Sequence, residues 1–202
     1  YPTVAEIDFS RFPKWPLEPA KGGVEVSTSQ ELADALDKGG TIRVRTGKYA
    51  LASELAISKS VRLSGDNVTI FPANPDVHGA LVITGDDVVI EGFTFEGFSG
   101  MVIQFGRTDG TTQKNLIFSR VTVRGGSDGF RTCPIDKPGK PQLSGLLLHE
   151  VRLEDQQLVA FNIGEGPATV GARVVDREEL PPSWSSVRCR SASSFLLTAS
   201  RA

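Results

Sequence analysis

Charged and amide side chains gather in and beside two polar segments of the sequence, residues 106–113 and 134–142. A cation next to a carboxylate neutralises it and lowers the cost of removing a proton from the adjacent carbon, and a well-placed Lys or Arg can itself act as the base. Arg131 and Asp128 are therefore our candidate catalytic residues. The candidate substrate-binding residues lie in the two segments or in the apolar stretches that accompany them: Gln104, Arg107, Asp109, Lys137, Lys140 and Asn162.

The elements that would position these residues form an internal repeat. Each copy consists of two apolar stretches of about three residues joined by a tight polar turn, and an array of stacked units is the usual meaning of such a period. The copies are Val61–Ile70, Val88–Phe98, Leu116–Gly126 and Leu146–Gln156. Their last apolar residues are separated by 25, 28 and 30 positions: Ile70, Phe95, Val123 and Leu153.

Stacking of parallel strands would place equivalent residues of successive copies side by side. Two columns are then expected to point inward: Leu63/Ile90/Phe118/Leu148 and Ile70/Phe95/Val123/Leu153. The residues before the second column would point outward and form a largely threonine ladder: Thr69, Thr94, Thr122 and Arg152. Charged columns are predicted for Glu96/Arg124/Glu154 and for Arg120/Glu150, and opposite charges on neighbouring strands stabilise each other modestly. We therefore exclude Arg120 and Arg124 from the catalytic candidates.

The segment before the repeats is divided into a proline-rich start and a short helix. Residues 1–23 combine four prolines with Phe9, Phe12 and Trp15, which predicts an extended path packed on the body. Thr28 followed by Glu31 fits a capping box. An apolar face follows, and Gly39-Gly40 ends the segment, so residues 29–38 are predicted to be an amphipathic helix.

Three stretches together resemble right-handed parallel β-helix proteins of the pectin-lyase-like superfamily: GGTIRVRTGKYAL, SVRLSGDN and VVIEGFTFEG. The resemblance covers about residues 24–165 and is specific for fold, not for activity. It implies an all-β fold, a right-handed single-stranded parallel β-helix of about five coils. In that family the N-terminal helix caps the open end of the coil, a role that residues 29–38 fit.

The resemblance also suggests a place and a chemistry for the candidate residues. Polysaccharide-cleaving members use an outer strand face beside long loops, so loops 106–113 and 134–142 would wall a groove. A cation that neutralises a sugar carboxylate there would imply lyase chemistry, with Arg131 in that role. An acidic polysaccharide is the substrate class that the resemblance implies.

Two other catalytic motifs of the superfamily have less support in the sequence. Gly85-Asp86-Asp87 resembles the paired carboxylates of the polygalacturonase branch, and inverting hydrolysis needs such a pair. The same residues, however, occupy the turn of Ser64-Gly65-Asp66 one repeat earlier, and the motifs N-T-D, G-H-G and R-I-K of that branch are absent. We therefore expect turn aspartates. The D-P-H-D signature of alginate epimerases is absent too.

Metal and cofactor chemistry has no clear signal. Calcium-dependent members of the superfamily cluster aspartates on one strand face, whereas Asp109, Asp128 and Asp136 are scattered here over loops and a strand. We therefore expect no metal and no cofactor, with calcium as an alternative that the sequence does not support. His78 and His149 are both expected on turn surfaces. Cys133 and Cys189 could pair in a secreted protein, but one buried and one incidental thiol is the reading we favour.

The composition limits the partners. A net charge of −2 gives no reason to expect nucleic acid or an anionic membrane surface, and no apolar run approaches a membrane span. The start, YPTVAEIDFS, lacks the regions of a signal peptide, which leaves an intracellular protein or one whose signal has been removed. We favour an extracellular location.

Three divisions and two function classes follow. Residues 1–23 form the proline/aromatic segment, 24–176 the β-helix, and 177–202 a tail that caps the end, exchanges with a neighbour or is disordered. The first hypothesis is a carbohydrate-interacting β-helix, with lyase or glycoside hydrolase activity if it is an enzyme. The alternative is a non-catalytic module for protein interaction or homo-oligomerisation, of the adhesin, tailspike or scaffold type.

Overall fold

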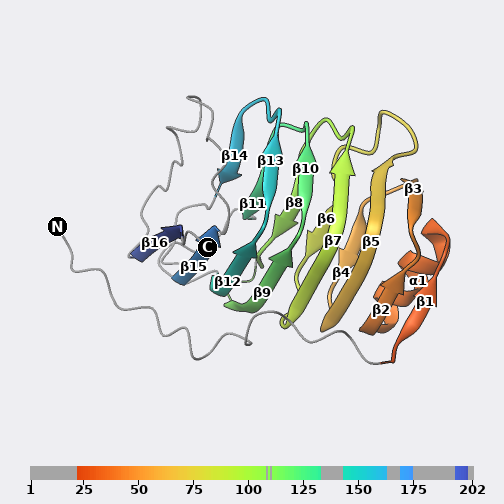
Figure 1. The fold of residues 1–202 in the computed structure, drawn as a ribbon, viewed down its shortest axis with the longest axis horizontal. Helices are drawn as coiled ribbons and strands as arrows, with labels where there is room; N and C mark the ends of the chain where they lie inside the picture. The colour runs from red at the N-terminus through yellow and green to blue at the C-terminus, as the bar shows by residue number, and fades with distance from the viewer. Residues whose placement is uncertain are drawn as a thin grey trace.

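The computed structural model describes residues 22–107, 109, 111–132, 143–162, 169–174 and 194–199 (Figure 1). Ser144 and the strands after Leu158 are described by their backbone alone. The fold is mostly β, with sixteen strands and one helix within these residues, and the helix is far too short to cross a membrane. All strand pairs are parallel.

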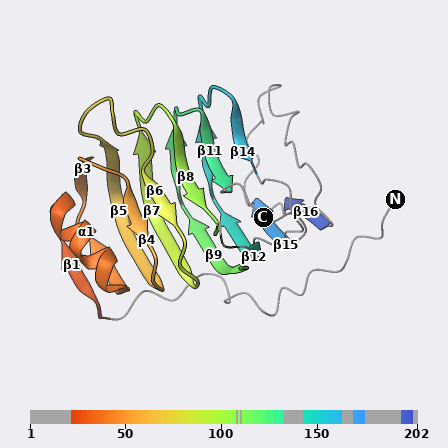
Figure 2. The same cartoon turned by 180° about the vertical axis from the view of Figure 1, so that it is seen from behind.

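The strands form two sheets that face each other (Figures 1 and 2). The larger sheet has eleven strands: β1 (Val24–Val26), β2 (Gly40–Val44), β3 (Gly47–Leu51), β5 (Val61–Pro72), β7 (Val88–Glu96), β9 (Gln113–Ser119), β10 (Thr122–Arg124), β12 (Leu143–His149), β13 (Arg152–Glu154), β15 (Thr169–Val174) and β16 (Ser194–Ala199). The smaller sheet has five, which Figure 2 shows from the near side: β4 (Leu55–Ile57), β6 (Leu81–Ile83), β8 (Met101–Phe105), β11 (Asp128–Thr132) and β14 (Val159–Asn162).

The chain alternates between the sheets in a regular order. It runs along the larger sheet, crosses to one strand of the smaller sheet, and returns beside its previous path. β5 and β7 are each continuous where we expected two strands. The first half of β5 pairs with β2 and its second half with β3. Each pass therefore contributes to three columns of strands.

The helix α1 (Ser29–Lys38) packs against β1 to β4 at the N-terminal end of both sheets (Figure 1). The predicted capping box is confirmed, because the Glu31 amide donates to Thr28 Oγ1 at 3.1 Å and the Thr28 amide donates to Glu31 Oε2 at 3.2 Å. The apolar face buries Leu32, Ala35 and Leu36. Gly39 ends the helix with a positive φ of 78°.

The predicted register is confirmed residue by residue. Leu63 pairs with Ile90, Ile90 with Phe118 and Phe118 with Leu148. The second inward column is equally regular, and its outward neighbours pair as a ladder: Thr69, Thr94, Thr122 and Arg152. Because parallel strands align equivalent positions about 4.8 Å apart, the repeat in the sequence becomes a set of straight columns.

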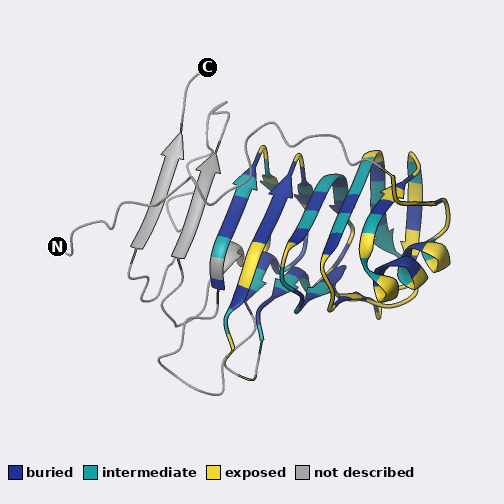
Figure 3. Cartoon of the chain, turned by 90° about the horizontal axis from the view of Figure 1, so that it is seen from below, coloured by how far each residue is buried: buried dark blue, intermediate teal, exposed yellow. Residues whose placement is uncertain are grey.

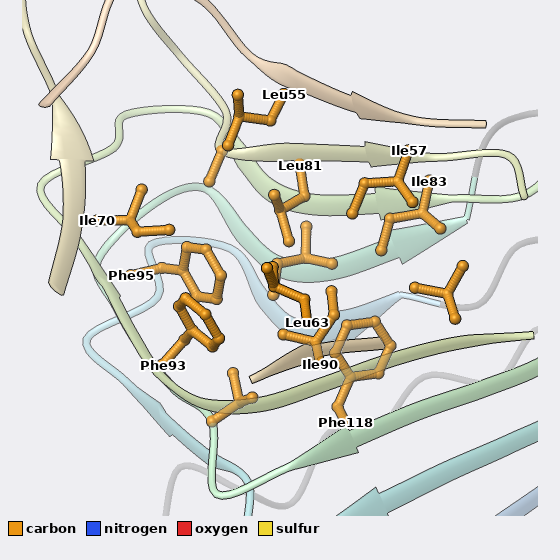
Figure 4. Close-up of a cluster of buried hydrophobic side chains, with 14 of the residues drawn as sticks. Leu55, Ile57, Leu63, Ile70, Leu81, Ile83, Ile90, Phe93, Phe95 and Phe118 are labelled. Atoms are coloured by element: carbon orange, nitrogen blue, oxygen red, sulfur yellow. The ribbon is translucent and has the colours of Figure 1, made fainter. Parts of the chain in front are cut away.

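The space between the sheets is filled by these inward columns (Figure 4). Phe118 and Phe130 meet edge to face, with ring centroids 4.9 Å apart and an interplanar angle of 84°. That arrangement is a favourable one for aromatic rings. Buried positions alternate with exposed or half-buried ones along β2 to β7, whereas β8, β9 and β11 contain runs of buried residues; Figure 3 shows burial by colour.

The corners between strand columns use left-handed backbone at equivalent positions. Three corner columns share the spacing of the repeat, 28 and then 30 residues: Asp87/Asn115/Gly145, Gly92/Arg120/Glu150 and Gly97/Gly125/Asp155. Each of these residues has a φ between 50° and 85°. Only glycine adopts this conformation without strain, and Asn and Asp tolerate it, so Arg120 and Glu150 are the unexpected members.

Candidate functional site

Three of the candidate residues lie in one row across the smaller sheet. Gln104 pairs in register with Arg131, and Arg131 with Asn162. Phe130 and Thr132, on either side of Arg131, are buried, so the strand alternation places Arg131 on the outer face. We call Gln104, Arg131 and Asn162 the outer row; Val82 and Ala56 continue it toward the N-terminal end.

Arg131 is held by the other catalytic candidate. Its Nη1 lies 3.1 Å from Oδ2 of Asp128, three residues earlier on β11. The Asp128 side chain is only 3% exposed, whereas the Arg131 side chain is 39% exposed. The carboxylate therefore orients the guanidinium from below, and the guanidinium is the member of the pair that meets solvent.

Arg107 has three partners on the protein itself. Its Nε donates to the Thr84 carbonyl at 2.8 Å, Nη1 to the Thr112 carbonyl at 3.4 Å, and Nη2 lies 3.0 Å from Asp86 Oδ1. These contacts tie the segment between β8 and β9 to the turn before β7. Arg107 is thus positioned as an anchor of the loop, and its role in substrate binding stays a prediction.

Asp109 closes a local turn. Its Oδ1 accepts from the Thr111 amide at 2.8 Å and from the Thr111 hydroxyl at 2.6 Å. Such turns are a common use of an exposed Asp. Lys137, Lys140 and the loop 134–142 lie outside the described residues, as do both cysteines and Asp136.

Gln113 is a structural residue that the sequence pattern did not reveal. It is fully buried at the start of β9. Its Nε2 donates to the carbonyls of Ile83 and Gly85 at 3.1 and 2.7 Å, and its Oε1 accepts from the Gly106 amide at 2.7 Å. A single amide thus satisfies three backbone groups at the corner where the candidate loop leaves the smaller sheet.

The aspartates of the sequence TGDD lie in the turn between β6 and β7, as expected. Asp87 has a left-handed φ of 56°, and its Oδ1 accepts from Asn115 Nδ2 at 2.7 Å. Asp86 Oδ1 accepts from the Lys114 amide at 2.8 Å. Both carboxylates therefore bind the following pass of the chain.

The two histidines differ in their exposure to solvent. His78 lies in an exposed loop, with Nδ1 2.8 Å from Ser99 Oγ. The prediction of a surface position is wrong for His149, which is only 5% exposed at the end of β12. It lies beside Ser119 and Glu150, at 3.5 Å from Ser119 Oγ and 3.9 Å from Glu150 Oε1.

The grouping of Ser119, His149 and Glu150 is superficially that of a hydrolytic triad. A nucleophile must reach its substrate, and Ser119 is fully buried. Ser119 and His149 are also register neighbours on adjacent strands, which accounts for their proximity. We therefore regard the group as a buried polar ladder.

The charged columns on the larger sheet are structural. Arg124 lies between Glu96 and Glu154, at 3.7 and 2.8 Å, as predicted. The hydrogen bond to Glu154 and its charge raise the pKa of Arg124. The predicted Arg120/Glu150 pair is different, because Arg120 pairs with Glu91 of the preceding pass at 3.2 Å. The left-handed corner at Arg120 lies next to the end of that earlier strand segment.

No group of three or more His, Cys, Asp or Glu side chains suited to a metal ion occurs in the described part of the chain. Comparisons with models of protein families, with curated proteins and with solved structures returned no match. The function must therefore be argued from the residues on the two sheet faces.

Proposed function

We propose that the chain is a right-handed parallel β-helix related to the pectin-lyase-like superfamily. The support is the order of its strands, in which each pass returns beside the previous one in parallel register. Parallel connections of this kind are right-handed in about 98% of known cases. The recurring left-handed corners, 28 and 30 residues apart, add a second line of support.

On this fold we propose binding of an acidic polysaccharide by the outer row. The observation that carries the proposal is the guanidinium of Arg131, held at the centre of the row by a buried carboxylate with an amide residue on each neighbouring strand. Arginine presents a planar set of donors that fits a carboxylate in two places at once. Amides supply both donors and acceptors, which suit sugar hydroxyls.

The geometry favours binding over cleavage. Lyase chemistry needs a base that reaches the substrate, and Asp128, the carboxylate paired with Arg131, is shielded from solvent. A cation that is anchored by a buried carboxylate and meets solvent itself is suited to neutralising an anionic chain. The strands lie about 4.8 Å apart, so a polymer running across them would meet a new side chain at each strand.

The test is binding to pectate, alginate, hyaluronan and chondroitin, measured by affinity electrophoresis and titration calorimetry. We expect Arg131→Met to weaken binding at least about tenfold, because a hydrogen-bonded charge contributes about 1.5–3 kcal/mol. The matched control is Arg43→Met, which removes the same charge from an exposed position on the larger sheet. Equal losses of binding affinity in the two variants, or no binding of the parent to any of the four polymers, would refute the proposal.

A parallel assay separates binding from cleavage. Lyases create an unsaturated product that absorbs in the ultraviolet. The absorbance is followed both in the presence and in the absence of calcium. A flat trace together with saturable binding is the outcome we expect. A rising trace that Arg131→Met abolishes would instead make the chain a lyase.

A further inference from the structure

The outer row and its continuation carry a single charge across all five strands of the smaller sheet. In sheet order, which Figure 2 shows from the near side, the residues in register are Ala56, Val82, Gln104, Arg131 and Asn162. We call these five residues the extended row, and Arg131 is the only one of them that is charged. With strands about 4.8 Å apart, the extended row is about 19 Å long.

The N-terminal part of the extended row is apolar. Ala56 and Val82 each lie between two buried residues of their strand, so the strand alternation turns them outward. Figure 4 shows the buried neighbours in the interior: Leu55, Ile57, Leu81 and Ile83. Ala56 is exposed and Val82 is half-buried. A charged ligand group that lay against these two side chains would lose water without gaining a partner, whereas the C–H groups of a sugar ring would not.

Two arginines at this part of the smaller sheet already have carboxylate partners within the chain. Arg131 is paired with Asp128 at 3.1 Å. Arg107, two residues after the end of β8, is paired with Asp86 at 3.0 Å. The two pairs therefore add no net positive charge to this face, and a long-range field that would attract a densely charged polyanion does not arise from them.

We propose that the ligand of this face is an acidic polysaccharide whose acid groups are separated by several neutral sugars. The inference rests on the polysaccharide binding proposed above. An extended chain of six-membered sugar rings advances by about one strand spacing per residue, so about five sugars would span the extended row. One carboxylate would then meet Arg131, and the neutral sugars beside it would meet amide and apolar residues.

A polymer with an acid on every sugar fits the extended row less well. One of its carboxylates can pair with Arg131, but those over Val82 and Ala56 would be partly dehydrated and would have no cation in the row. Removing acid groups from such a polymer should therefore raise its affinity, until the carboxylate that pairs with Arg131 is lost as well. Unspecific attraction of a polyanion predicts the opposite, a steady fall in affinity as charge is removed.

The experiment measures the affinity of the full chain for one polysaccharide backbone at three acid contents. Pectate chains of equal length are used untreated, with about one carboxyl in five retained, and with none retained, the other carboxyls having been reduced to primary alcohols. Titration calorimetry at physiological ionic strength gives a dissociation constant for each polymer. We expect the partly reduced polymer to bind at least about fivefold more tightly than either of the other two.

A second cation in the extended row should change this preference. Val82→Lys and, in a separate variant, Ala56→Lys each place an ammonium group where a second carboxylate of untreated pectate would lie. Each should raise the affinity for untreated pectate at least about fivefold and that for the partly reduced polymer less than about twofold. The matched control is Thr69→Lys, which adds the same charge at a half-buried position of the larger sheet and should change neither affinity by more than about twofold. Circular dichroism establishes that each variant is folded.

The outcomes separate this inference from the proposed function. An affinity that falls steadily from untreated pectate to the fully reduced polymer would overturn the spacing of the acid groups and leave the binding of an acidic polysaccharide intact. Equal effects of Val82→Lys and Thr69→Lys on the affinity for untreated pectate would overturn it too. No binding of any polymer, or binding that is tightest for the fully reduced one, would refute the binding of an acidic polysaccharide itself.

Discussion

Removing one member of the Asp128–Arg131 pair should have very different consequences from removing the other. At 3.1 Å and an effective dielectric constant of about 20, the gross attraction is about 5 kcal/mol. Much of it is offset by desolvation of the carboxylate, and solvent at the 39% exposed guanidinium screens the remainder, so the net contribution is about 1 kcal/mol.

The asymmetry arises from burial. Arg131→Met leaves a carboxylate that is 3% exposed without its cation, which should lower the free energy of unfolding by about 3 kcal/mol. Asp128→Asn leaves a guanidinium that reaches water, and the loss should be about 1 kcal/mol. The double variant should therefore be more stable than Arg131→Met alone.

Urea unfolding followed by circular dichroism measures these differences as shifts of the midpoint. The double-mutant cycle isolates the coupling between the two side chains. If Asp128→Asn costs as much as Arg131→Met, or if the double variant is the least stable of the three, the carboxylate is not buried as described. The double variant is also useful in the binding assay, because it removes the Arg131 charge and leaves no unpaired carboxylate behind.

Three further predictions concern the corners and the helix cap. Gln113→Ala should lower the free energy of unfolding by about 2 kcal/mol, because it removes a buried donor to the Gly85 carbonyl, whereas the Gly106 amide and the Ile83 carbonyl still bond each other. Gln156→Ala should cost about 1 kcal/mol, because its amide bonds three carbonyls where water has access. Equal urea midpoints for the two variants would contradict this. Gly92→Ala should destabilise the fold strongly, since the new Cβ would lie 2.0 Å from a backbone carbonyl oxygen. Arg120→Gly at the equivalent corner should raise the free energy of unfolding by about 1 kcal/mol, because glycine adopts the left-handed backbone without strain. Thermal melts in which both variants are less stable than the parent would refute this prediction. Hydrogen bonds from Ser27 lower the pKa of Glu31. The stability that the Glu31 carboxylate contributes is therefore present above its pKa in the unfolded chain and is lost as the pH falls through its pKa in the folded protein. On acidification the urea midpoint of the parent should drop relative to that of Glu31→Gln, and parallel plots of midpoint against pH would contradict the capping role.

The sequence was sufficient for the columns that build the interior. The apolar residues of each repeat recur at the same place, and a strand places alternate residues on opposite faces, so Leu63, Ile90 and Phe118 had to lie together once the copies were stacked. The charged column of Glu96, Arg124 and Glu154 followed from the same register.

The candidate site was predictable in part. The sequence singled out Gln104, Arg131 and Asn162 as candidates, and the register of consecutive passes brings them into one row. The depth of Asp128 was not predictable, because it depends on how the chain turns into β11. The three partners of Arg107 were not predictable for a similar reason, since they are fixed by the path of a loop, and its role in substrate binding stays a prediction.

The sequence by itself therefore determined the strands, their register and the residues that fill the core, because those depend on periodicity along the chain. The tertiary structure alone decided which polar side chains are buried and which face solvent, as at His149, Gln113 and Asp128. Burial is a property of everything that surrounds a side chain, and residues 28 or 30 positions apart supply those surroundings. Local sequence carries no record of that distant environment.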